Sequence, residues 1–417
     1  MKSFWKIAEL VSCLAWSVAS IAGESTCEPD GLQPSSAIYR ICMPPAEAWN
    51  GDLVVYAHGY VSQAEPFGIP EEQLIVGDTS LPEVINLLGF AFATTSYRDN
   101  GLVVREGVLD ILELVALFES QHGKPGHVYL VGPSEGGLVT ALALEQYPDV
   151  FDGGVAACGP IGDFRAQLDY VGDFRVLFDY YFPGLLPGSP TMIPAEVMQN
   201  WESIYVPSIR AAILANVPRT REFLRVARGP VDSFDSSNLL NSIENTVLTV
   251  LWYNVFGTND AIVKLGGQPF DNATRYYFGS QSDWLLNLGV ARFSAEPAAI
   301  QNVALYYQTT GELNVPVVTP HTVSDEIIFY RHENLYARKL AMAGNSSMST
   351  RIPIFRYGHC QFTIGELIFS FALVVRDVTG RELSDVEAIL QRFSAESVWA
   401  PVDRRPEADS TGRTRNE

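Results

Sequence analysis

The segment VYLVGPSEGG, from Val128 to Gly137, decides the fold of this chain. Its apolar start predicts a buried strand, and the apolar spacing from Leu138 to Tyr147 predicts a helix directly afterwards. Gly132, Ser134 and Gly136 therefore fall on a sharp turn from strand to helix. Glycines let the backbone pass close on either side of such a turn, and a serine at its apex is exposed to a base. The pattern predicts Ser134 to be a nucleophile; the alternative is an ordinary glycine-rich turn between a strand and a helix.

An activated serine needs a base, which the sequence places late in the chain. The chain has six histidines. His359 follows a strand-like run, Arg351 to Tyr357, and a helical pattern begins near Thr363. It is therefore expected on a loop just past the last strand, which is the position of a general base in this arrangement. The alternative is a buried structural histidine.

The acid that orients the base is expected between the serine and His359. Val315 to His321 reads as a strand, and a helix is predicted from Ile327 to about Ala343. Asp325, on the loop between them, is the favoured acid because its carboxylate would accept from the His359 ring. Glu326 is the rival acid. The alternative for both carboxylates is a structural role, in which they only stabilise the N-terminus of the following helix through its dipole.

Donors for an oxyanion are expected upstream of the serine. Leu53 to Ala57 reads as a short apolar strand, and His58-Gly59-Tyr60 follows it. The backbone N–H of Tyr60, or of Gly59, is the predicted first donor, and that of Glu135 is the second. His58 precedes the serine and is interpreted as a scaffold residue.

Together these motifs resemble the α/β-hydrolase superfamily, in its branch of secreted serine esterases, lipases and peptidases. The matching pieces are VVYAHGY, GPSEGG, HTVSD and YGHC, in the family's order, between about residues 50 and 375. The resemblance implies a mostly parallel sheet flanked by helices. It implies Ser134 as nucleophile, Asp325 as acid and His359 as base, in two-step acyl transfer without a cofactor. The chain has no His-Gly-Gly-Gly loop, so the acyl pocket of lipases with that loop does not carry over.

Three functions stay open at this point. The favoured one is hydrolysis of a small-molecule ester, with an apolar or aromatic substrate. A peptidase, or a transacylase or cyclase of small-molecule biosynthesis, would use the same triad. A non-catalytic binding protein on the hydrolase fold is the third, although all three triad candidates are present.

The long stretch from Cys158 to Val315 predicts an inserted, mainly helical cap. We expect a signal peptide at 1–23, core at 24–160, cap at 161–312, core again at 313–398 and a disordered tail at 399–417. The cap aromatics could line a pocket or form the cap's own core, and for any one residue the core is favoured. They are Phe174, Phe178, Tyr180, Tyr181, Phe182, Trp201, Trp252, Tyr253, Tyr276, Tyr277, Phe278 and Trp284.

Several features predict export. Lys2 and Lys6 precede a mainly apolar stretch with small residues near Ala22, typical of a signal peptide; a short membrane anchor is the alternative. Four cysteines remain beyond it and allow three pairings, of which Cys27–Cys42 with Cys158–Cys360 is favoured. Asn272 and Asn345 begin glycosylation sequons. We therefore expect a secreted glycoprotein without stable membrane insertion.

The net charge of −20 disfavours nucleic acid as a partner. No spacing of cysteine and histidine predicts a zinc site, so no metal is expected. With 47% hydrophobic residues, the chain has ample material for one large core plus the cap. The oligomeric state is not predicted.

Overall fold

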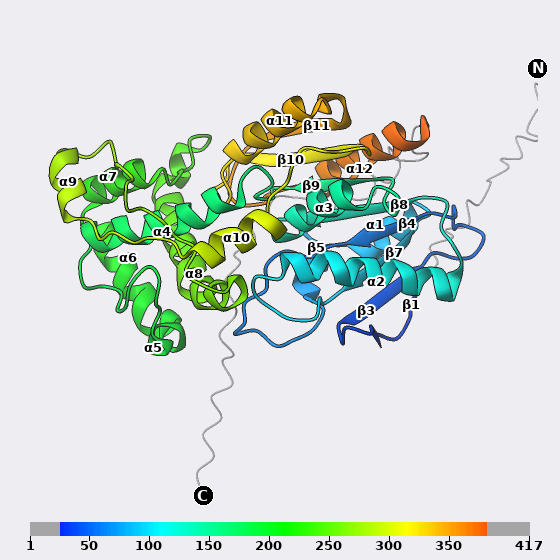
Figure 1. The fold of residues 1–417 in the computed structure, drawn as a ribbon, viewed down its shortest axis with the longest axis horizontal. Helices are drawn as coiled ribbons and strands as arrows, with labels where there is room; N and C mark the ends of the chain where they lie inside the picture. Colours follow the sequence, from blue (N-terminus) through cyan, green and yellow to red (C-terminus); the bar gives the residue numbers. More distant parts are fainter. Residues whose placement is uncertain (1–25, 382–417) are drawn as a thin grey trace, which may run out of the picture.

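The computed structural model describes residues 26–381. Its main sheet has the strand order β1-β3-β7-β4-β8-β9-β10-β11, with β2 also paired to β3 (Figure 1). Neighbouring strands from β7 to β11 are parallel, whereas β3 is antiparallel to β1, β2 and β7. The strands are β1 Thr26–Cys27, β2 Gly31–Leu32, β3 Ile38–Met43, β4 Leu53–Tyr56, β7 Ala91–Thr95, β8 Val128–Pro133, β9 Gly153–Ala157, β10 Val317–Ser324 and β11 Ser349–Tyr357. A separate hairpin pairs β5 Ile75–Val76 with β6 Thr79–Ser80.

Helices cover both faces of the sheet, which is why the central strands β4, β7 and β9 are buried throughout. Adjacent residues of β4 show the alternation: Val55 packs in the core beneath α2 (Val104–His122) and α3 (Glu135–Gln146), and Val54 packs with α12 (Ile364–Thr379). The flanking helices are α1 Leu81–Leu87, α2 Val104–His122, α3 Glu135–Gln146, α11 Arg331–Ala343 and α12 Ile364–Thr379, with short 3-10 turns at Glu71–Leu74 and Ser346–Met348.

A helical region is inserted between β9 and β10 and gathers at one end of the molecule (Figure 1). It has its own hydrophobic core, which includes Phe174, Phe223 and Leu251. Its last helix packs instead on the sheet-side core through Ala299 and Val303. The elements are α4 Phe164–Tyr181, α5 Ala195–Gln199, a π-helical turn Trp201–Tyr205, α6 Val206–Ala215, α7 Val217–Ala227, a 3-10 turn Ser236–Asn238, α8 Leu239–Leu265, α9 Asp283–Gly289 and α10 Pro297–Tyr306.

This topology confirms the predicted fold class: a mostly parallel sheet between helices, with Ser134 between β8 and α3 and a helical insertion before the acid. The expected segment 1–23, the tail 399–417 and part of 313–398 lie outside the described residues, and the expected domain limits remain predictions. Among residues 26–381, no helix is long and apolar enough to span a bilayer.

Two predicted boundaries near the acid are wrong. The strand expected to end at His321 continues to Ser324, so His321 is a fully buried strand residue rather than a strand end. The helix expected from Ile327 begins only at Arg331. The reason is local, because the Asp325 carboxylate accepts from the N–H groups of Ile327 and Ile328 and forms a turn of its own.

The favoured cysteine pairing is present in the structure. Cys27–Cys42 joins the paired strands β1 and β3. Cys158–Cys360 joins the end of β9 to the loop after β11. The second bridge therefore connects the strand that follows the serine helix to the loop that carries His359.

Candidate active site

Ser134 stands at the apex of a tight turn between β8 and α3. Its φ of 57° and ψ of −123° are sparsely populated for a residue with a side chain. The flanking glycines make the turn possible. A Cβ on Gly136 would lie 2.0 Å from the carbonyl oxygen of Ala57, and one on Gly132 would lie 2.4 Å from that of Gly136. The turn therefore packs directly against the end of β4.

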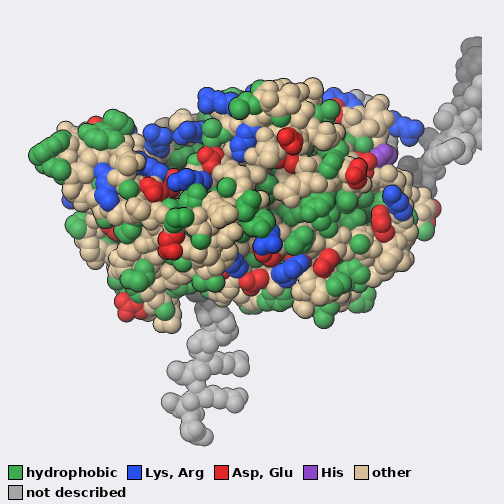
Figure 2. All heavy atoms as spheres, viewed as in Figure 1, with side chains coloured by type: hydrophobic (Ala, Val, Ile, Leu, Met, Phe, Trp, Pro, Cys, Tyr) green, Lys and Arg blue, Asp and Glu red, His purple; other side chains and the backbone are tan. Residues whose placement is uncertain are grey.

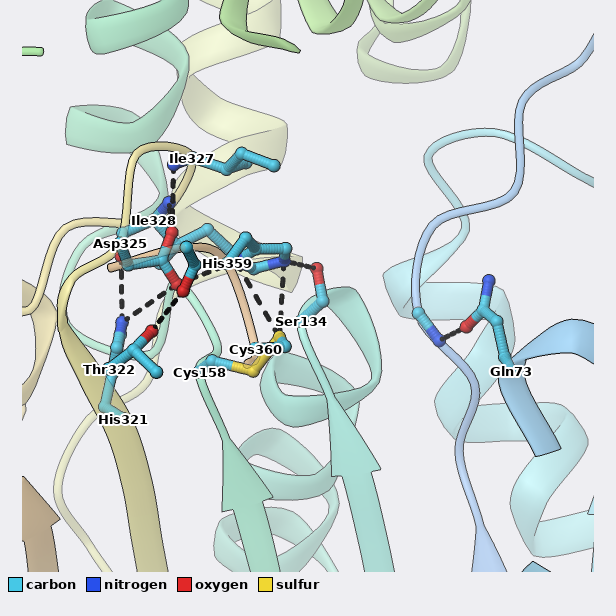
Figure 3. Close-up of a disulfide and its surroundings, with 12 residues drawn as sticks. Gln73, Ser134, Cys158, His321, Thr322, Asp325, Ile327, Ile328, His359 and Cys360 are labelled. Carbon is cyan, nitrogen blue, oxygen red and sulfur yellow. Dashed lines mark hydrogen bonds and ion pairs between the residues drawn. A yellow bond between two sulfur atoms is a disulfide. The ribbon is translucent and has the colours of Figure 1, made fainter. Parts of the chain in front are cut away.

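The structure brings Ser134, His359 and Asp325 into one hydrogen-bonded line (Figure 3). The distance from His359 Nε2 to Ser134 Oγ is 2.9 Å, and His359 Nδ1 lies 2.7 Å from Asp325 Oδ2. With Asp325 accepting from Nδ1–H, Nε2 is left free to accept the hydroxyl proton of Ser134. This is the geometry that a serine nucleophile with a general base requires.

Asp325 is the carboxylate that contacts the His359 ring, as the sequence favours. It is 1% exposed, and its Oδ1 accepts from the N–H groups of Ile327 and Ile328 at 2.9 and 2.8 Å. Burial raises the pKa of Asp325, but the neighbouring charges of His359 and His321 and the hydrogen bonds to these rings outweigh burial and hold the pKa below its usual range. The carboxylate is therefore held ionised and fixed in orientation.

A second histidine, His321, lies behind Asp325 and was not foreseen from the sequence. Its Nδ1 is 3.1 Å from Glu333 Oε1, and its Nε2 is 2.8 Å from the carbonyl oxygen of Ile328. Both ring nitrogens face oxygen acceptors, so both carry protons. Burial lowers the pKa of His321, but Asp325 and Glu333 outweigh burial and raise it to about 10. His321 is a buried imidazolium between two carboxylates.

Glu326, the rival acid, points elsewhere. Its Oε1 accepts from Asn245 of α8, and its backbone carbonyl accepts from the Tyr170 hydroxyl. Burial, aided by the charge of Asp325, raises the pKa of Glu326 to about 8. The Glu326 side chain therefore belongs to the contact between α8 and the loop after β10.

The loop that carries His359 is fixed at several points. Cys360 is bonded to Cys158, and its Sγ lies 3.4 Å from His359 Nε2 (Figure 3). Thr322 Oγ1 donates to the carbonyl of Gly358 at 2.7 Å. Cys158, His359 and Cys360 also have metal-ligand spacing, but both sulfurs are consumed by the disulfide.

The structure corrects one predicted oxyanion donor. The N–H of Gly59 donates to Gln73 Oε1 at 2.7 Å, so it is already engaged (Figure 3). Gln73 Nε2 also donates to the Tyr60 carbonyl, and Gln73 therefore fixes the loop after β4. Glu135 is the first residue of α3, whose N–H has no helical acceptor. The N–H groups of Tyr60 and Glu135 remain the predicted donors.

The other histidines do not reach Ser134. His58 is buried against Tyr97, and its Nδ1 faces the Gly59 carbonyl at 2.7 Å. Burial lowers the pKa of His58 to about 4, so its ring is neutral, as suits the scaffold role predicted for it. His332 is buried in α11, and burial lowers its pKa to about 3. His122 and His127 are partly exposed, next to Glu28 and Asp52.

A mostly apolar cavity of ≈ 140 Å³ opens beside Ser134. It runs under the inserted helices, between α4 and α8, and Tyr253 is the only one of the cap aromatics named from the sequence that lines it. Phe174, Phe178 and Tyr181 are in the cap's own core, as was favoured for individual aromatics. Sequence reasoning missed lining residues such as Phe164 and Gly257, because helical spacing does not show which face meets the sheet.

The two sequons differ in the structure. Asn272 is fully buried, and its Nδ2 donates to the Tyr277 hydroxyl and to the carbonyl of Ala291. A glycan on this nitrogen has no space in the folded protein, so the expectation for Asn272 is wrong. Asn345 is partly exposed, with its Nδ2 donating to Gly311, and its glycosylation remains a prediction.

Fold and geometry together define an α/β-hydrolase fold with an aligned serine, histidine and aspartate. No protein-family model and no curated protein matches the sequence. Solved structures that match this one include an acylaminoacyl peptidase of Pyrococcus horikoshii (12% identity, 88% of this chain, 44% of that chain, TM-score 0.45). A second is an esterase of Pyrococcus furiosus (12% identity, 88% of this chain, 92% of that chain, TM-score 0.41). A third is lipase A of Candida antarctica (12% identity, 84% of this chain, 76% of that chain, TM-score 0.42). This chain therefore spans less than half the length of the peptidase.

Proposed function

We propose that this protein is a secreted serine hydrolase that cleaves carboxylic esters with apolar acyl groups. The observation that carries the proposal is the continuous line from Asp325 through His359 to Ser134, ending at an apolar cavity. The two disulfides support a protein made for an oxidising compartment. Finding the mature chain in the medium of expressing cells would test export separately.

The proposed reaction has two steps. Ser134 Oγ attacks the ester carbonyl while His359 Nε2 takes the hydroxyl proton, and the oxyanion accepts from the N–H groups of Tyr60 and Glu135. His359 then gives its proton to the departing alcohol, which leaves an acyl group on Ser134. Water then attacks this acyl group while His359 takes one of its protons, and His359 passes that proton to Ser134 Oγ as the acid leaves.

The cavity supports a substrate with an apolar acyl group. Among its lining residues, the ionisable carboxyl is Glu135, and burial raises the pKa of Glu135 to about 8. This carboxyl is therefore mostly protonated at neutral pH and does not make the cavity a site for a cation. The apolar walls instead suit an acyl chain.

The test is fluorophosphonate labelling of the wild-type protein and of Ser134→Ala, followed by assays on p-nitrophenyl esters and aminoacyl p-nitroanilides. We expect one label per wild-type chain, none on the variant, and turnover of the esters. Faster turnover of the anilides would indicate a peptidase, and acyl transfer to an added alcohol in preference to water would indicate a transacylase. A folded wild type that takes no label would overturn the catalytic proposal and favour a binding protein.

A further inference from the structure

We propose that the cavity beside Ser134 is an acyl chamber for one apolar chain of about six carbon atoms, and that the absence of a side chain at Gly257 of α8 leaves room for this chain. The inference rests on the proposed ester hydrolysis and adds the class of acid to it. It concerns a residue that neither the sequence motifs nor the triad geometry singles out.

The walls of the cavity come from α4 and α8. Phe164, Leu168 and Val171 line it from α4, and Gly257 and Ala261 line it from α8. Such walls bind a chain by removing its methylene groups from water, which stabilises the complex by about 0.8 kcal/mol per group.

The polar side chains on these walls are already hydrogen-bonded within the protein. Gln167 Nε2 donates to the carbonyl of Ile327 at 2.8 Å. Asn254 Nδ2 donates to the carbonyl of Pro190, and its Oδ1 accepts from Arg175. Because these groups are satisfied, the chamber does not require polar groups on the ligand.

The position of His359 indicates which part of the ester, the acyl group or the alcohol, occupies the cavity. The departing alcohol must lie against His359, which gives it a proton. His359 is absent from the cavity lining, whereas Ser134, Tyr60 and Glu135 are part of it. The chamber therefore extends from the serine and the predicted oxyanion donors, on the acyl side of the scissile bond.

The size of the chamber follows from its volume. A closed apolar cavity of about 150 Å³ holds one benzene molecule, which has six carbon atoms. The cavity here measures ≈ 140 Å³. We therefore expect a hexanoyl chain to fill this volume, and the further methylene groups of longer chains to extend beyond it and contribute less to binding.

Gly257 is a position where an added side chain would occupy part of the chamber. A Cβ built there meets a single atom within 4 Å, the hydroxyl oxygen of Tyr60 at 3.7 Å. Gly172, which also lines the cavity, differs because a Cβ there would lie 2.3 Å from the ring of Phe270. A side chain at position 257 would therefore project into open space, and one at position 172 would collide with the wall.

The experiment compares the wild type with Gly257→Ala, Gly257→Leu and Gly257→Phe on p-nitrophenyl esters from acetate to decanoate. In the wild type, we expect kcat/KM to rise about fourfold per methylene up to hexanoate and then level off. In Gly257→Phe, the ratio of kcat/KM for hexanoate to kcat/KM for acetate should fall at least about tenfold, with Gly257→Ala and Gly257→Leu between the wild type and this variant.

The matched control is Val263→Phe, on the same helix but 79% exposed, which should keep the wild-type profile. Thermal unfolding checks the fold, since glycine within a helix costs about 1 kcal/mol relative to alanine, and Gly257→Ala should be no less stable than the wild type. An unchanged length profile in a folded, fluorophosphonate-reactive Gly257→Phe would overturn the chamber while leaving ester hydrolysis standing. The chamber proposal would also be overturned if the Gly257 variants changed how kcat/KM depends on the length of the alcohol, measured with a series of acetate esters. Absence of fluorophosphonate labelling in the wild type would instead contradict the proposed function, ester hydrolysis by Ser134.

Discussion

Nε2 of His321 lies 3.6 Å from Oδ2 of Asp325, the same oxygen that accepts from His359. One carboxylate thus faces two histidines, and the one behind it is a fully buried cation whose other neighbour is Glu333. This arrangement keeps Asp325 ionised although the side chain is buried. Buried charges of this kind persist only when each has a partner of opposite sign.

Glu333→Gln should destabilise the protein in a pH-dependent way. The pKa of His321 is raised from 6.5 to about 10, so its contribution to stability is complete below pH 6.5 and is lost as the pH rises through about 10. At pH 6, breaking the pair should cost about 3–5 kcal/mol. Unfolding midpoints of wild type and variant, measured from pH 6 to 10, should converge at the alkaline end. A gap that is the same at every pH would show that the charge of His321 is not involved.

Asp325→Asn and Glu326→Gln separate the two adjacent acids. Asparagine at 325 cannot hold the His359 tautomer, and we expect kcat to fall by about 10⁴-fold. Glutamine at 326 keeps the acceptor for Asn245, so kcat should fall less than about threefold. Steady-state kinetics on one ester decides the matter, and the reverse order of effects would exchange the roles of the two residues.

Gln73→Ala should impair turnover without touching the triad. Gln73 holds the N–H of Gly59 and the carbonyl of Tyr60, and so positions the predicted donor at Tyr60. We expect kcat to fall about ten- to a hundredfold, less than the largest losses seen for an oxyanion donor itself, with KM little changed. Gln73→Glu keeps the acceptor oxygen and should recover part of the rate. Wild-type kcat in the alanine variant would exclude this role.

The two disulfides should differ in what they support. Replacing Cys158 and Cys360 by serine frees the His359 loop and should lower both kcat and the melting temperature. Replacing Cys27 and Cys42 is the matched control, which should lower stability by about 3 kcal/mol for its short loop but leave kcat unchanged. Equal kcat values for the two double variants would show that the Cys158–Cys360 bridge does not position the base.

Stability should decline from mildly acidic to alkaline pH, in part because of Glu135. Burial raises the pKa of Glu135 from 4.5 to about 8, so its favourable contribution is complete below pH 4.5 and is lost as the pH rises through 8. Glu135→Gln keeps an acceptor for the N–H of Val103. Thermal midpoints at pH 5 and 9 should therefore differ less in this variant than in the wild type. An identical pH dependence would rule out Glu135 as a source of the decline.

The face shown in Figure 2 has no surface of a single charge sign. Acidic and basic side chains are interspersed there among apolar and neutral ones, so the net charge of −20 is not gathered into a patch on that face. Of the export features, the described residues contain the two disulfides, whereas the predicted signal segment lies outside them.

The sequence by itself determined the elements whose signals are local. The turn at Ser134 follows from glycines that must pass within van der Waals distance of a neighbouring strand, and such glycines stand at fixed offsets from the serine. The order of the motifs then predicted the sheet and the partners Asp325 and His359, because parallel strands bring their carboxyl ends to one edge. Two of its expectations failed where tertiary contacts intervened: the N–H of Gly59 is taken by Gln73, and Asn272 is buried.

Only the tertiary structure decided what surrounds these residues. His321 and Glu333 read as ordinary strand and helix residues, and their pairing depends on how α11 packs against β10. Gly257 carries no signal of its own, and its role at the chamber depends on which face α8 turns toward Ser134. Such relationships join residues far apart in the chain through packing and burial, and packing is set by the whole core rather than by any local pattern.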